Sequence, residues 1–297
     1  MLKKSALLGM VALTLLLLSS PSFCTEEYKI GVLSNRGRDH ALSEWKTTAA
    51  YLSRELGKPF SIVPLGDTQL ASWTEQGRLD FVYTNPAQYL ELSKLCGIEA
   101  IATVVTSTVS GSADQFGSVI FVRRDSQINE LADLKDKGLM CRGRLAFGGW
   151  RAAECLFNES GIDPDTYFKS LRYTNSHSNV VYAVQYGVVQ AGVVRTGILE
   201  AMAHEGKIKM EEFRVIHPVD DGFPLVHSTP LYPEYPIAVS AKVPKKIRDQ
   251  VQQVLFALKP TDTAGVAAKI VGYGSPIDYA SVLACVITLD KTASSKP

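Results

Sequence analysis

The chain has 297 residues, of which 46% are apolar and 21% are charged. This composition excludes an intrinsically disordered protein, because disordered chains combine low hydrophobicity with high charge. Lys and Arg number 31 against 30 Asp and Glu, so the charge balance does not favour nucleic acid or an anionic membrane as a bulk partner. The length fits one or two domains that can bury sizeable cores without disulfides.

The first 24 residues have the pattern of a secretion signal. A short basic start precedes an uninterrupted apolar run over residues 6–18, which is too short to span a bilayer. The small residues Ser22 and Cys24 predict cleavage after Cys24, and therefore an exported, periplasmic protein. The alternative is a lipoprotein acylated at Cys24, which bulky Phe23 disfavours. We expect no membrane span in the mature chain.

Four cysteines follow the predicted signal, and they are Cys96, Cys141, Cys155 and Cys285. They form no CxxC motif and have no His nearby at metal-ligand spacing, so no metal site is predicted. Most lie in apolar segments, where a free cysteine behaves as a small hydrophobic residue. The alternative is one Cys141–Cys155 bridge, because both residues flank one loop.

Strand and helix patterns alternate from residue 28 onward, which is typical of a mainly parallel sheet with helices on its faces. In the first part of the chain, strands are expected over residues 28–33, 60–65, 79–84 and 98–106. Helices are expected over 42–56, around Leu70 and Trp73, and from Asn85-Pro86 onward. The polar stretch 107–117 is predicted to be a loop.

A second unit begins at residue 118. Its strands are expected over 118–123, 139–142, 171–174, 191–195 and 214–216, and its helices over 128–137, 147–160, 175–184 and 198–204. A Pro- and Gly-rich connection over 220–236 leads to a strand at 236–241, a helix at 244–258 and a terminal helical segment at 278–289. We therefore predict two α/β lobes. Lobe 1 is discontinuous, over 25–117 plus 223–297, and lobe 2 is inserted over 118–222.

Strand-to-helix junctions are the expected ligand site, because ligands of open α/β sheets bind where strands end and helices present unpaired N–H groups. Such junctions occur at residues 83–86 in the first lobe and at 146–149 and 175–178 in the second. Glycines let a ligand approach the backbone, and helix starts bind anions. The combination predicts an oxyanion held between the lobes. The alternative is that each junction merely caps its helix.

Two side chains could add charge or hydrogen bonds to such a site. His177 could donate to an anion, or it could be a surface or capping histidine. Arg195 ends an apolar strand and could bind an oxyanion through two N–H groups, or it could pair with Glu200. Tyr83 and Tyr89 could form a wall of the site or belong to the core.

Signatures of common enzyme classes are missing from the sequence. It contains no GxSxG, no HExxH, no phosphate loop ending in GK[ST] and no GxGxxG after the first strand. Thiol catalysis would need Cys141 beside His177, and nothing in the sequence brings them together. We therefore favour binding over catalysis, and predict no cofactor.

The junction motifs, taken in order, resemble a known family. They are Tyr83-Thr84-Asn85-Pro86, ADLKDKG ending at Gly138, Phe147-Gly148-Gly149-Trp150, Ser176-His177, and Ala191-Gly192-Val193-Val194-Arg195-Thr196. This order is similar to the phosphonate-binding family of periplasmic solute-binding proteins. The resemblance is closest to the branch that includes the sensing region of tetrathionate-sensor histidine kinases. It implies the type II binding-protein fold, in which two lobes close on a ligand.

The resemblance also implies a set of ligand-binding residues, which are Tyr83, Thr84, Asn85, Phe147, Gly148, Gly149, Trp150, Ser176, His177, Arg195 and Thr196. Phosphonate binders have hydroxyl residues where this chain has Ala146 and Phe147, and they place an acid for a ligand amino group near Glu234. We therefore expect a small oxyanion, phosphonate- or phosphate-like or sulfur-based, for delivery to an ABC importer. The alternatives are a sensory protein acting with a separate histidine kinase, and an organic ligand held by Tyr83, Phe147 and Trp150.

Overall fold

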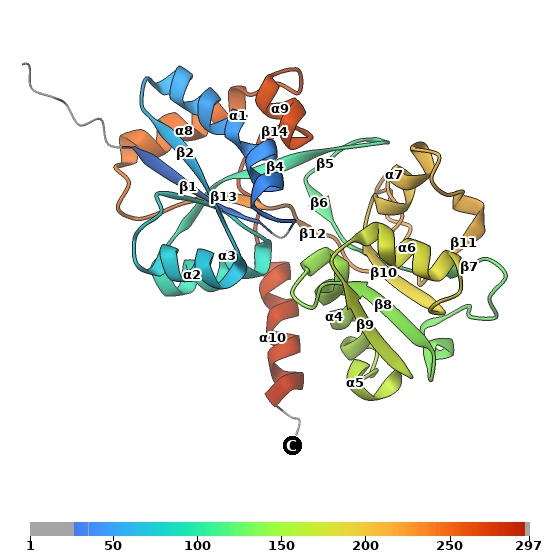
Figure 1. The fold of residues 1–297 in the computed structure, drawn as a ribbon. Coiled ribbons are helices and arrows are strands. Elements are labelled where there is room, and N and C mark those ends of the chain that lie inside the picture. The colour runs from blue at the N-terminus through green and yellow to red at the C-terminus, as the bar shows by residue number, and fades with distance from the viewer. Residues whose placement is uncertain (1–26, 35, 295–297) are drawn as a thin grey trace, which may run out of the picture.

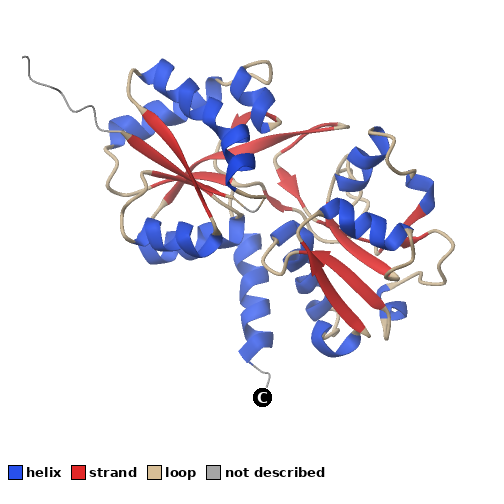
Figure 2. Cartoon of the chain, viewed as in Figure 1, coloured by secondary structure: helices blue, strands red, loops and turns tan. Residues whose placement is uncertain are grey.

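The computed structural model describes residues 27–34 and 36–294. Within these residues, strands form a seven-stranded sheet, a five-stranded sheet and a two-stranded ribbon, and helices flank both larger sheets (Figure 2). In this part of the chain, no helix combines the length and the apolar character needed to span a bilayer. The predicted export signal and the alternative lipid anchor at Cys24 lie outside the described residues.

The larger sheet combines strands from both ends of the described chain. Its strands are β1 (Tyr28–Leu33), β2 (Phe60–Leu65), β3 (Phe81–Tyr83), β4 (Glu99–Thr108), β5 (Gly111–Ala113), β13 (Pro236–Val239) and β14 (Ile270–Gly274). The order is β14-β4-β13-β3-β1-β2, with β5 paired to β4. β1 runs parallel to β2 and β3, and β13 is antiparallel to its neighbours. Nearly all of β1 is buried, as expected of a strand with helices on both faces.

Helices cover both faces of this sheet. α1 (Arg38–Leu56), α8 (Lys245–Ala257) and α9 (Thr263–Ala268) lie on one face, and α2 (Asp67–Glu75) and α3 (Pro86–Cys96) on the other (Figure 1). α1 buries Trp45, Ala49 and Leu52, whose spacing of three and four residues places them on one side of a helix. The sequence patterns do not predict α9 and β14, because both are too short and too rich in small residues to show a clear hydrophobic period.

The five-stranded sheet is built from the middle of the chain. Its strands are β7 (Ser118–Arg123), β8 (Gly138–Arg142), β9 (Ser170–Thr174), β10 (Ala191–Arg195) and β11 (Phe213–Ile216), in the order β11-β7-β10-β8-β9. The helices are α4 (Ala152–Glu159), α5 (Pro164–Tyr167), α6 (His177–Gln185) and α7 (Ile198–His204), with short turns η1 (Leu131–Leu134), η2 (Phe147–Arg151) and η3 (Met210–Glu212). Separate apolar clusters form on its two faces, one containing Trp150 and Phe157 and the other containing Phe121 and Val180.

A short antiparallel ribbon joins the two sheets. β6 (Gln115–Phe116) pairs with β12 (Tyr232–Pro233), so that Phe116 lies opposite Tyr232. The predicted loop over 107–117 is therefore wrong in part, because β5 and β6 lie within it. The predicted helix over 128–137 is also too long, since only the single turn η1 forms there. The short, polar β5 pairs with the end of β4 in a hairpin, whereas β6 pairs with the distant β12, so neither strand shows a clear hydrophobic pattern of its own.

Helix α10 (Ala280–Ser294) is bonded covalently to α4. A disulfide joins Cys155 of α4 to Cys285 of α10 across 130 residues of sequence, with a Cα–Cα distance of 5.7 Å. The expectation of free thiols is therefore wrong for Cys155 and Cys285, the alternative Cys141–Cys155 bridge is also wrong, and Cys141 is a buried free thiol. Sequence separation carries no information on which cysteines meet in space. α10 also contacts α3 and β12, so it touches both sheet units and the ribbon between them (Figure 1).

Removing the disulfide should lower the free energy of unfolding by about 2–5 kcal/mol, because a cross-link over a long loop restricts the unfolded chain. Denaturant titration of the Cys155→Ser/Cys285→Ser double variant measures this loss. Cys96→Ser is the matched control, since Cys96 is a free and only half-buried thiol. Equal shifts of the unfolding midpoint in the double variant and the control would contradict the assignment.

Candidate functional site

Two glycines of the turn η2, Gly148 and Gly149, are tightly enclosed. A Cβ on Gly148 would lie 2.8 Å from the Phe116 ring and 3.1 Å from Cγ of Arg195. A Cβ on Gly149 would lie 2.7 Å from the carbonyl oxygen of Arg142 and 3.1 Å from Cε1 of His177. Only glycine fits at these two positions. Their lack of side chains brings the backbone of η2 against residues from four other elements.

The three predicted junctions differ in how their helix starts are capped. Asn85 caps α3, because its side-chain oxygen accepts a hydrogen bond of 3.0 Å from the N–H of Gln88. Ala146 precedes η2 and has no side-chain acceptor, and Ser176 precedes α6 without making a side-chain cap bond. The first-turn N–H groups of η2 and α6 are thus not capped by a side chain. An anion is the ligand that such N–H groups favour.

His177 begins α6 and faces η2. Its Nδ1 is buried and has no hydrogen-bond partner among the described residues. Burial lowers the pKa of His177 to about 3, and the positive charges of Arg142, Arg195 and Arg36 add to the effect. His177 is therefore neutral at pH 7. These guanidinium groups lie close enough to act on one imidazole, which shows that the surroundings of His177 carry a positive potential.

Arg142 and Arg195 share one edge of the five-stranded sheet. β8 and β10 are parallel neighbours, and these arginines are their last residues. No ion pair of the Arg142 side chain occurs within residues 27–34 and 36–294. Arg36 comes from the other unit, between β1 and α1, and forms an ion pair of 2.8 Å with Glu44. The site therefore draws basic groups from both units.

Arg195 is fixed by contacts with the inter-sheet segment. Its guanidinium pairs with the carboxylate of Glu234 and lies 4.1 Å from the centre of the Phe116 ring. The alternative pair with Glu200 is wrong, since the Glu200 carboxylate instead accepts a hydrogen bond of 2.8 Å from the N–H of Val226. Glu234 lies near the position where the family resemblance places an acid, and its carboxylate pairs with Arg195.

At the first junction, residues 83–86, the side chains of Tyr83 and Thr84 contact neighbouring residues of the protein. The Tyr83 ring lies between Trp45, at 4.1 Å, and Tyr235, at 5.5 Å between ring centres. Burial raises the pKa of the Tyr83 phenol well above its usual value, so it stays protonated and able to donate a hydrogen bond. Thr84 is buried and hydrogen-bonds to the Gln88 side chain.

Three further predicted residues pack into the protein. Phe147 and Trp150 have no exposed surface. Phe147 contacts the rings of Phe116 and Tyr232, and Trp150 lies in the core of the five-stranded sheet. Thr196 is buried and exchanges hydrogen bonds with the backbone of Gly117. Gly148, Gly149, His177 and Arg195 lie together at η2, whereas the side chains of Trp150 and Thr196 point into packed surroundings.

Sequence reasoning missed Arg142, Arg36, Phe116 and Tyr235. A signal for Arg142 was available, since it ends a predicted strand in the same way as Arg195, and strands that end in arginine at one sheet edge bring their charges together. Arg36 and Tyr235 lie in connecting segments, where no periodic pattern indicates which way a side chain faces. Their part in the site depends on the folding of distant segments.

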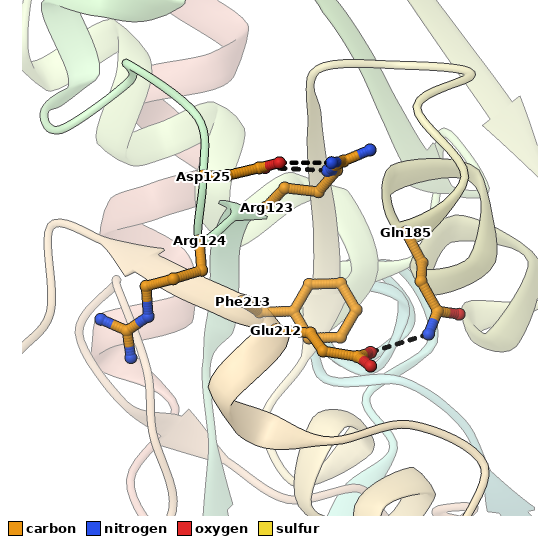
Figure 3. Close-up of a pocket in the computed structure, with 6 residues that line it drawn as sticks. All are labelled: Arg123, Arg124, Asp125, Gln185, Glu212 and Phe213. Carbon is orange, nitrogen blue, oxygen red and sulfur yellow. Dashed lines mark hydrogen bonds and ion pairs between the residues drawn. The ribbon is translucent and has the colours of Figure 1, made fainter.

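A separate hollow of about 380 Å³ lies near the carboxyl end of α6, away from His177 (Figure 3). It is lined by Arg123, Arg124, Asp125, Gln185, Glu212 and Phe213. Most of its polar groups already bind one another. Arg123 pairs with Asp125, and the Gln185 side chain donates a hydrogen bond of 2.8 Å to Glu212 (Figure 3). None of the predicted ligand-binding residues lines it.

Two helix-flanked sheets, a connecting ribbon and uncapped helix starts at the sheet edge define the type II periplasmic binding-protein class. Residues 30–277 match the sequence profile of the family described as "ABC transporter, phosphonate, periplasmic substrate-binding protein". The chain belongs to this family.

Known relatives agree with this assignment. The tetrathionate sensor histidine kinase TtrS of Salmonella typhimurium is 34% identical over 233 residues, which are 77% of this chain and 39% of the kinase. The chain thus spans about two fifths of that relative's length. PhnD1 of Prochlorococcus marinus in complex with methylphosphonate has the same fold, with a TM-score of 0.69, 14% identity and coverage of 90% of this chain and 99% of PhnD1. XAC2383 of Xanthomonas citri bound to ATP gives a TM-score of 0.66 at 20% identity, with coverage of 88% and 95%.

The buried His177 should make the protein less stable in acid. Its pKa is about 3 when folded and near 6.5 when unfolded, so the unfolded chain binds more protons between these pH values. The free energy of unfolding should therefore fall as the pH drops below about 6.5. Between pH 7 and pH 5 this residue should account for at most about 2 kcal/mol.

Urea titrations at pH 7 and pH 5 measure this effect. Between pH 7 and pH 5, the free energy of unfolding should fall much less in His177→Gln than in wild type, because glutamine does not titrate. His204→Gln is the control, since His204 lies on the surface of α7. If His177→Gln lost as much stability as wild type on acidification, the buried neutral state of His177 would be refuted.

Proposed function

We propose that this protein captures a small oxyanion at η2 and delivers it to an ABC importer. One observation carries the proposal: Arg142, which has no ion-pair partner in residues 27–34 and 36–294, packs with His177 against Gly149, where the η2 backbone has no side chain. A phosphorus or sulfur oxyanion has the charge for this potential and the acceptor oxygens for the N–H groups. The family supports the transport role.

The groups of the site have complementary roles in this proposal. The uncapped N–H groups of η2 and α6 hold the oxygens, and the guanidinium of Arg142 supplies the opposite charge. His177 offers Nδ1, which has no partner within the described residues. Tyr83 supports the other side through its stack with Trp45 and Tyr235.

Ligand capture would proceed by closure of two lobes, for which we propose residues 25–117 plus 223–297 and residues 118–222. Arg36 lies in the first of these and Arg142 and His177 in the second, so one anion could contact both. A ligand favours the closed form only as far as it binds that form more tightly. The disulfide crosses this proposed boundary, because α10 belongs to the first lobe and α4 to the second.

Arg142→Gln should weaken oxyanion binding at least about tenfold, since a hydrogen bond between charged groups contributes about 1.5–3 kcal/mol. Isothermal titration calorimetry would follow a thermal-shift screen of phosphate, phosphite, methylphosphonate, sulfate, thiosulfate and tetrathionate. The panel includes the ligand of the PhnD1 structure and the anion in the name of TtrS.

Arg144→Gln is the matched control for charge. Arg144 lies two residues away from Arg142 on the surface, and it is not among the charges that act on His177. Its replacement should leave affinity within about twofold, well under the effect of a lost charged hydrogen bond. Equal losses in the two variants would mean that net charge, rather than this site, attracts the anion. Failure of every anion to bind wild type would refute the proposal.

A second candidate function is ligand sensing with a separate histidine kinase. The observation that favours it is the 34% identity to TtrS. A strain that lacks this protein distinguishes transport from sensing. Loss of uptake of the labelled anion identifies transport, whereas normal uptake with loss of an anion-induced transcriptional response identifies sensing.

A further inference from the structure

Arg195 differs from the other basic groups of the site because it forms an ion pair with a buried carboxylate. Glu234 is only 1% exposed, and its Oε1 binds the guanidinium of Arg195 and accepts a hydrogen bond of 3.3 Å from the Thr106 hydroxyl. Its Oε2 accepts a hydrogen bond of 3.3 Å from the N–H of Tyr235. Each carboxylate oxygen thus has a hydrogen-bond partner within the protein, and the negative charge of Glu234 is paired with Arg195.

Arg195 is held on several sides. Its guanidinium lies 4.1 Å from the centre of the Phe116 ring and 5.9 Å from that of Tyr235, within the range of cation–π attraction. Its Cγ lies against Gly148, so its aliphatic part borders η2 while its charge is directed to Glu234. Arg195 thus contacts the backbone of η2 with its aliphatic part and the buried Glu234 carboxylate with its guanidinium.

This arrangement decides which charges a ligand can meet. A ligand ammonium group near Arg195 would need a carboxylate partner, and the charge of the Glu234 carboxylate is already paired with Arg195. It would also lie near the guanidinium of Arg142, which has no ion-pair partner in the described residues and adds to the lowering of the pKa of His177. Placing a cation there without a partner is costly, because desolvation and like-charge repulsion both oppose it.

We infer that the site selects oxyanions that carry no ammonium group, and that Arg195 determines this selectivity by neutralising Glu234. The inference rests on the oxyanion site proposed above and names its ligand class. In this assignment Arg195 is a specificity residue, and Arg142 supplies the charge that the anion meets.

The test compares ligands that differ only in the ammonium group. Ethylphosphonate is paired with 2-aminoethylphosphonate, and ethanesulfonate with 2-aminoethanesulfonate. Competition calorimetry on the full chain gives the affinity ratio within each pair. Wild type should prefer the ammonium-free member of the pair it binds by at least about tenfold, which corresponds to about 1.4 kcal/mol.

Arg195→Met should reverse or abolish this preference. Methionine keeps an apolar side chain next to Phe116 but leaves the Glu234 carboxylate free to bind an ammonium group. Adding Glu234→Gln to that variant removes the carboxylate and should restore the preference for the ammonium-free ligand. This double variant also avoids an unpaired buried charge, and so it checks that changes in preference do not arise from misfolding.

Glu234→Gln alone provides an independent test if Arg195→Met does not fold. It leaves the guanidinium of Arg195 without its carboxylate partner, and it should increase the preference for the ammonium-free ligand severalfold over that of wild type. Equal binding of both members of a pair by wild type would overturn the inference and leave the oxyanion function standing. An unchanged ratio in both single variants would also overturn it. Absence of oxyanion binding in wild type would refute the proposed function itself.

Discussion

Close packing around Gly148 and Gly149 is the constraint on which the site depends. A side chain at Gly148 would collide with Phe116, and one at Gly149 would collide with the carbonyl of Arg142. Because neither residue has a Cβ, η2 can begin directly against the carboxyl ends of β8 and β10. The same packing places His177 beside this backbone. Protein interiors adjust little to added volume, so these contacts fix how closely η2 lies to Phe116, Arg142, Arg195 and His177.

The charges at this edge fall into two kinds. Arg195 is bound to the buried Glu234 and stabilises the segment between the sheets, whereas the Arg142 side chain has no ion-pair partner in the described parts of the chain. His177 remains neutral because burial and the surrounding guanidinium groups disfavour its protonation. Because His177 is uncharged, the positive charge beside this backbone comes from the guanidinium groups. The charge of Arg195 is therefore used within the protein, whereas the charge of Arg142 has no carboxylate partner in the described parts of the chain.

Two connections link the sheets next to this site. The β6–β12 ribbon joins the units at Phe116 and Tyr232, next to the ion pair of Arg195. α10 adds a covalent connection through Cys155 and Cys285, and it contacts α3 as well. α3 begins at the first predicted junction, and α4 follows η2. One helix therefore touches both helices that extend from the two sides of the site.

The sequence by itself determined the alternation of strands and helices, the positions of the three helix starts and the family, because these depend on local spacing and on short motifs. It did not determine that Cys155 pairs with Cys285 or that Glu234 binds Arg195. Nor did it reveal Arg142 as part of the site. These contacts join residues far apart in the chain, and they form only when the sheets, the ribbon and α10 are packed together. Tertiary structure decides them because side-chain direction and distance follow from that packing.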